Sequence, residues 1–374
     1  MKKTRVTTLI TLAFLALFLT ACSGAVSESW PGVAVEGEKI YLSYATQIYQ
    51  LNPANGVEQW RFPAEANNKI NYYAPVALSE DGSQLLVGSY NHVFYGIPSG
   101  GTQSSWSFSE AKDRYIAKAL VLGDLVYAGA ADGNLYAIGL DGNLRWKFTT
   151  GHAIWGAPAT DGKALYLASM DHHIYALDPQ SGEMIWKTDD LGGQLVAQPA
   201  LSSTGILYVG AFGSKTRTDN PERSSKLVAV DASNGQILWS KPTNGWVWAT
   251  PLLNQDVLYF GDTEGFIYGF SANDGSQLWS RQLDTGAKRA IIGAPVILGD
   301  RLYFGSKAGL LYIVNPANGE PAVASPVQIG GEILADLVVT VDKILIAPTG
   351  LENTLLLAVN QDGLTQWSFI PQKK

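Results

Sequence analysis

Few side chains in this chain of 374 residues have the types and spacing that catalysis needs. The histidines are His92, His152, His172 and His173, and Asp171 precedes the third of them. Two imidazoles and a carboxylate can ligate a transition metal. However, Asp or Asn recurs at equivalent turns, where turn geometry explains it, so we predict no metal site. Because the sequence also lacks a phosphate-binding glycine loop and a nucleophile elbow, we predict a protein that is not an enzyme and needs no cofactor.

The single cysteine, Cys22, belongs to a segment with a different chemistry. Three basic residues in the first five positions precede a short apolar run, which is typical of a secretory signal. The sequence LTAC ending at Cys22 resembles a bacterial lipobox. We therefore expect a signal peptide over residues 1–21, a lipidated linker over residues 22–29, and anchoring by acyl chains to a bacterial cell membrane or outer membrane. The alternative is that Cys22 is a leftover residue of an ordinary signal peptide.

Regularly spaced tryptophans indicate a repeat architecture. Seven of them recur at intervals of 40 to 53 residues, except that the last interval of 88 residues spans two periods: Trp60, Trp106, Trp146, Trp186, Trp239, Trp279 and Trp367. A period of 40–45 residues matches one four-stranded propeller blade. Eight similar strand-and-turn segments, from QIYQLNPANG to LLLAVNQDG, accompany them, and Val323 lies near the missing tryptophan. We predict an all-β, eight-bladed β-propeller of four-stranded antiparallel blades over residues 30–374.

The segment IYALDPQSGEMIW, which ends at Trp186, resembles the repeat of the quinoprotein-type (PQQ-like) β-propellers. The resemblance implies that each tryptophan docks one blade against the next. Many enzymes of that group hold their quinone beside adjacent cysteines, which this chain lacks. The lipidation signal makes the chain more similar to the lipid-anchored, non-enzymatic BamB-like scaffolds of outer-membrane assembly. BamB-like rings close by strand exchange, whereas this chain ends on its own fourth strand, so the mode of closure stays open.

Aromatic side chains precede the first strands of several blades. They fall on the face of the ring here called the top face. This face carries the loops that lead from the fourth strand of one blade to the first strand of the next blade, and the loops between the second and third strands of each blade. If this column faces the channel mouth, it forms a collar suited to contact; if it faces the neighbouring blade, it is core. The candidate binding residues are Tyr72, Tyr115, Trp155, Trp246 and Trp248, with Trp30 in the same column.

The longest irregular stretch runs from Phe212 to Lys226, in the fifth blade. A loop of this length within a compact repeat is usually functional or disordered. We predict that Lys215, Arg217 and Arg223 contact a partner there, and the alternative is a tolerated insertion.

The charge balance excludes one class of partner. The formal net charge is 26 − 33 = −7, which argues against nucleic acid. Together these features predict a lipid-anchored, monomeric envelope scaffold that binds other envelope proteins or peptides through its top face. The alternatives are a receptor for a small ligand or peptide at the channel mouth and, more distantly, a PQQ-dependent dehydrogenase.

Overall fold

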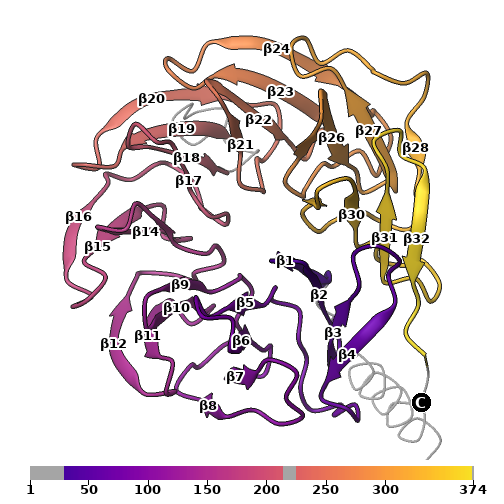
Figure 1. Ribbon diagram of the computed structural model, residues 1–374. Helices are drawn as coiled ribbons and strands as arrows, with labels where there is room; N and C mark the ends of the chain where they lie inside the picture. The colour runs from indigo at the N-terminus through magenta and orange to yellow at the C-terminus, as the bar shows by residue number, and fades with distance from the viewer. Residues whose placement is uncertain (1–28, 214–224, 373–374) are drawn as a thin grey trace, which may run out of the picture.

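The computed structural model describes residues 29–213 and 225–372 and confirms the predicted eight-bladed propeller. Eight four-stranded antiparallel sheets surround a central axis, with β1 and β5 on the inner side of the ring and β12, β16 and β24 at the outer rim (Figure 1). Every blade consists of four strands that are consecutive in the chain. Within the described residues, no helix has the length and apolar character needed to cross a membrane.

The first four blades occupy the N-terminal half of the ring. Their strands are β1 (Gly32–Glu36), β2 (Lys39–Tyr44), β3 (Gln47–Leu51) and β4 (Glu58–Phe62); β5 (Ala77–Leu78), β6 (Gln84–Gly88), β7 (Phe94–Pro98) and β8 (Trp106–Phe108); β9 (Leu120–Leu122), β10 (Leu125–Gly129), β11 (Asn134–Gly139) and β12 (Leu144–Thr149); and β13 (Ala159–Thr160), β14 (Leu165–Ala168), β15 (Ile174–Leu177) and β16 (Met184–Lys187).

The last four blades complete the ring. Their strands are β17 (Ala200–Leu201), β18 (Ile206–Ala211), β19 (Lys226–Asp231) and β20 (Ile237–Pro242); β21 (Leu252–Asn254), β22 (Val257–Gly261), β23 (Phe266–Ser271) and β24 (Gln277–Gln282); β25 (Val296–Leu298), β26 (Arg301–Gly305), β27 (Leu310–Val314) and β28 (Val327–Gln328); and β29 (Val338–Val339), β30 (Ile344–Ile346), β31 (Leu356–Val359) and β32 (Thr365–Phe369).

Burial follows the position of a strand within its blade. The second and third strands lie between two neighbouring blades, so every residue of β10, and all but the first of β11, is buried. The fourth strand has one face on the next blade and one toward solvent, and the residues of β12 accordingly alternate between half-buried and exposed. This arrangement explains why apolar runs mark the middle strands while polar residues alternate along the outer ones.

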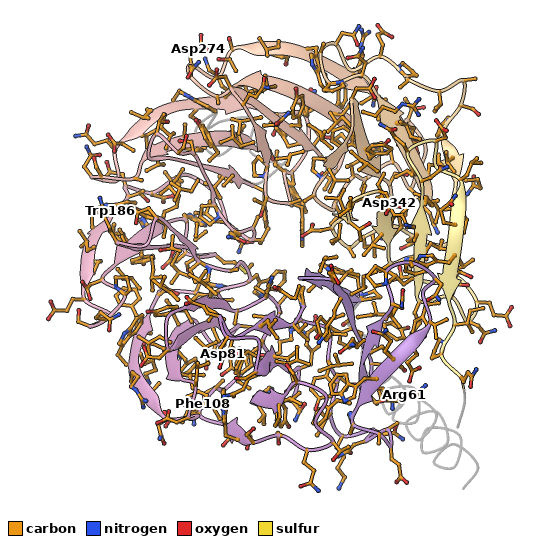
Figure 2. All side chains as sticks on the ribbon, viewed as in Figure 1. Arg61, Asp81, Phe108, Trp186, Asp274 and Asp342 are labelled. Atoms are coloured by element: carbon orange, nitrogen blue, oxygen red, sulfur yellow. The ribbon has the colours of Figure 1, made fainter. Side chains whose placement is uncertain are left out.

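The repeated tryptophans dock each blade on the next, as the resemblance implied. The indole N–H of Trp146 donates to the carbonyl oxygen of Pro179 at 3.0 Å, in the following blade. Its ring lies over Gly182, whose φ is +72° and where a Cβ would come within 2.5 Å of the indole. Only glycine combines that backbone conformation with so close an approach. Figure 2 shows the corresponding Trp186 on β16 at the outer rim.

Among the described residues, the ring closes by docking of the last blade on the first and not by strand exchange. The indole N–H of Trp367 in β32 donates to the carbonyl oxygen of Pro53 in the first blade at 3.0 Å. The indole ring lies on Gly56, in the turn between β3 and β4. In the seventh blade, which lacks the tryptophan, Val323 and Val327 pack in the core shared with the eighth blade, and Val327 lies against Gly363. The docking tryptophan and a shared apolar core therefore join the first and last blades, which are separate sheets.

Candidate functional site

The segments that approach the first strands line an axial cavity of about 190 Å³. All eight blades contribute to its wall, and the large apolar side chains include Trp30, Trp155 and Trp248. The glycine that follows Trp155 has a steric cause: a Cβ on Gly156 would lie 2.4 Å from the carbonyl carbon of Ala197 in the next blade. Of the two orientations left open for the aromatic column, the structure places these three tryptophans against the channel.

The structure contradicts the placement of Tyr72 in the collar. This side chain is 1% exposed and packs with Phe62 and Tyr95 in the core between the first two blades, at ring-centroid distances of 6.3 and 5.9 Å. The cause is a shift of one residue in the second blade. Strand β5 begins two residues after Pro75, whereas β13 begins directly after the equivalent Pro158. A shift by one residue exchanges the two faces of an extended segment.

Tyr115 is also wrongly assigned to the collar. It is 1% exposed and packs between Phe94 and Tyr136, at centroid distances of 5.4 and 6.4 Å. A Cβ on Gly88 would lie 2.2 Å from the Cβ of Tyr115, so the glycine leaves room for the tyrosine side chain. Burial raises the pKa of the Tyr115 hydroxyl. Tyr115 therefore joins two blades and is not available to a partner.

The other three predicted aromatics, together with Phe212, form a continuous cluster on the top face, here called the aromatic cluster: Trp155, Phe212, Trp246 and Trp248. Trp248 stacks on Phe212 with a centroid distance of 5.5 Å and an interplanar angle of 7°. Trp155 lies 6.3 Å from Trp248, and Trp246 lies 5.3 Å from Phe212. The three tryptophans are each half-buried, so part of every ring faces outward. The cluster unites the fourth, fifth and sixth blades.

The aromatic cluster also forms the base of the long loop between β18 and β19. The indole N–H of Trp246 donates to the carbonyl oxygen of Gly213 at 3.2 Å, immediately before that loop. The predicted contact residues Lys215, Arg217 and Arg223 lie outside the described residues, as do Cys22 and the rest of the predicted signal and linker up to residue 28. Phe212 was not a predicted binding residue, although its position beside the long loop could have indicated it.

Two charged side chains, Lys118 and Asp336, also line the axial cavity. The Lys118 ammonium is ion-paired with Glu36 of the first blade. Asp336 accepts a hydrogen bond from the backbone N–H of Ala294 through Oδ1 at 2.7 Å. Its side chain is exposed to the lumen, and desolvation by the surrounding protein raises the pKa of the Asp336 carboxyl. The sequence prediction did not include Lys118, Glu36 or Asp336 among the binding residues.

The histidine-rich turn of the fourth blade performs a structural task. Asp171 accepts hydrogen bonds from the Tyr175 hydroxyl at 2.6 Å and from the Gly151 backbone N–H at 2.7 Å. The Nδ1 atom of His172 lies 3.2 Å from Asp190, and that of His173 lies 2.9 Å from a backbone carbonyl oxygen. Among the residues that the structure describes, no three His, Cys, Asp or Glu side chains are grouped so that they could hold a metal ion.

Comparison with known proteins finds relatives that are named for two different functions. Tetrathionate hydrolase from Acidithiobacillus ferrooxidans is 27% identical over 230 residues, which cover 58% of this chain and 43% of the hydrolase. The outer membrane protein assembly factor BamB of Yersinia pestis is 23% identical over 288 residues, covering 72% of this chain and 68% of that protein. The chain spans less than half the length of several of the curated relatives that it matches.

The fold comparison agrees with the sequence comparison. The crystal structure of BamB from Moraxella catarrhalis superimposes with a TM-score of 0.69 at 17% identity, covering 90% of this chain and 96% of that one. The family profile described as outer membrane protein assembly factor BamB matches residues 23–153, 91–210 and 170–342, which together span most of the chain. With its eight blades, its docking tryptophans and these matches, the chain belongs to the BamB family of PQQ-repeat β-propellers.

Proposed function

We propose that this protein is a non-catalytic envelope scaffold, anchored by lipid at Cys22, that holds other envelope proteins or peptides on its top face. The observation that carries the proposal is the aromatic cluster, in which four rings from three blades remain partly open to solvent around the base of the long loop. Partly exposed aromatic rings at a concave surface are what protein contacts use as anchors. The relatives named for outer membrane protein assembly support a role in that process.

The geometry of the ring supports a contact on the top face. The top face carries the aromatic cluster and the long loop, whereas the opposite face carries short turns between first and second and between third and fourth strands. Asp81 shows what those turns do: its carboxylate accepts hydrogen bonds from the side chains and backbone of its own turn. Because turn geometry accounts for that chemistry, the top face is the better contact surface. The partners would be proteins of the outer-membrane assembly machinery. The scaffold would bind them as a monomer, close to the membrane.

The proposal is tested by co-purification of the full-length, membrane-bound protein with the outer-membrane assembly proteins of its source bacterium. We expect the double variant Trp155→Ala/Trp248→Ala, and deletion of residues 214–224, to weaken co-purification at least roughly tenfold, as loss of interface anchors does. The matched control is Val341→Ala, which removes an apolar side chain that is 99% exposed in the turn between β29 and β30 on the opposite face. Unchanged binding in both top-face variants, or loss in the control, would overturn the assignment.

Hydrolysis of an inorganic sulfur compound is the alternative that the tetrathionate hydrolases favour. The two proposals are separated by incubating the purified protein with tetrathionate and measuring its consumption. Turnover that disappears in a variant of the axial cavity, such as Asp336→Asn, would support an enzyme and contradict a purely structural role.

A further inference from the structure

We propose that the axial cavity is a binding site for a small organic cation of the alkylammonium or quaternary ammonium class. The cation would lie among the indole rings of Trp30, Trp155 and Trp248, with the Asp336 carboxylate as its counter-ion. All four side chains line the same cavity, although they come from the first, fourth, sixth and eighth blades. The cavity shares Trp155 and Trp248 with the proposed partner contact, whereas Trp30 and Asp336 belong to the cavity alone.

The size of the cavity limits the ligand. Its volume is about 190 Å³, somewhat more than the roughly 150 Å³ of an apolar protein cavity that takes up benzene. A ligand of about six to ten non-hydrogen atoms therefore fits. That range includes choline and similar methylated amines.

The wall has the chemistry that recognises a cation. The faces of indole rings attract ammonium groups, and quaternary ammonium ligands are bound between several such rings. Packing fixes the rings in advance: Trp248 is stacked against Phe212, and Trp155 leans on Trp248 at an interplanar angle of 51°. A preorganised wall loses little side-chain entropy when the ligand binds.

The charges of the lining favour a cation over an anion. The charged side chains that line the cavity are Lys118 and Asp336. Lys118 is already ion-paired with Glu36, so an anionic ligand would have to compete for it. Asp336 accepts a hydrogen bond from the Ala294 backbone N–H, and among the described residues no cationic side chain forms an ion pair with it. The Asp336 carboxylate faces the lumen, so a cation bound in the cavity could form an ion pair with it.

The test compares choline with 3,3-dimethylbutan-1-ol, a neutral molecule of almost the same shape, by titration calorimetry on the folded protein. We expect choline to bind and the neutral analogue to bind roughly tenfold more weakly or not at all. Asp336→Asn should weaken choline binding by a similar factor, since the amide still accepts the Ala294 N–H but has no charge. The matched control is Asp342→Asn, which removes an exposed carboxylate of the same blade outside the cavity.

Three outcomes would overturn the inference: equal affinity for choline and its neutral analogue, choline affinity unchanged by Asp336→Asn, or no choline binding up to about 10 mM. The melting temperature of each variant, measured without ligand, shows whether it is folded, and Trp30→Leu gives a second, uncharged probe of the wall. Asp336→Asn should leave co-purification of partners unchanged, so that failure of this site and failure of the scaffold proposal are distinguishable.

Discussion

Substitutions at Gly56 and Trp367 test the contact that closes the ring. Gly56 has a φ of +69°, and a Cβ built on it would lie 2.4 Å from Cε3 of the Trp367 indole. Carbon atoms in contact prefer about 3.5–4.0 Å, so Gly56→Ala must displace the indole or the turn. Gly37 provides a matched control, because its φ is +59° but a Cβ there would meet nothing within 4 Å.

The expected costs differ between the two glycines. Gly37→Ala adds only the left-handed backbone strain, about 1–2 kcal/mol of unfolding free energy. Gly56→Ala adds the same strain and an overpacking cost of about 1–3 kcal/mol, giving a total of about 2–5 kcal/mol. Trp367→Ala removes a buried indole together with its hydrogen bond to Pro53, which costs about 3–5 kcal/mol. In the double variant Gly56→Ala/Trp367→Ala the clash is gone, so its cost should fall below the sum of the two single costs by about 1–3 kcal/mol.

Urea unfolding, followed by tryptophan fluorescence and circular dichroism, measures these free energies. Coincident transitions from the two probes are needed before the free energies are compared. The reasoning is refuted if Gly56→Ala costs no more than Gly37→Ala, or if the costs of Gly56→Ala and Trp367→Ala are simply additive. Either result would mean that the last blade does not rest on the first through this contact.

Three further predictions concern the anchor, the turns and the core. Cys22→Ser should release the protein from membranes without changing its fold, and persistent sedimentation with washed membranes would contradict lipidation. Hydrogen bonds within their turns lower the pKa of Asp81 and of Asp274 to about 2, below the ordinary value of 3.8. Their stabilisation is therefore complete above about pH 4 and is lost as the pH falls through about 2, so Asp274→Asn should show a smaller drop in melting temperature between pH 5 and pH 2 than the parent protein. Tyr115→Phe should change stability by less than about 1 kcal/mol, because the buried Tyr115 hydroxyl has no hydrogen-bond partner in the structure. Tyr268→Phe should cost about 1–3 kcal/mol, because that hydroxyl is hydrogen-bonded to a buried carboxylate at 2.7 Å, and equal costs for the two variants would contradict the assigned partners.

The sequence by itself determined the architecture. The tryptophan period and the eight strand-and-turn segments are local patterns, and each blade is built from consecutive residues. The number of blades, the antiparallel order and the docking role of residues such as Trp146 therefore follow without knowledge of distant contacts. The sequence also indicates which way the tryptophan side chains of the fourth strands point. A large ring that alternates with polar neighbours on an edge strand packs against the next blade, while the polar neighbours face solvent.

Only the tertiary structure decided which side chains share a site. A shift of one residue before β5 turned Tyr72 from the channel into the core, and the repeat pattern carries no record of such a shift. Trp30 and Asp336 are more than 300 residues apart in the chain, yet both line the axial cavity. Lys118 of the third blade forms an ion pair with Glu36 of the first blade. These contacts depend on how the ring closes around its axis. A local sequence pattern fixes the shape of each blade, but the spacing and rotation of all eight blades fix what meets at the centre.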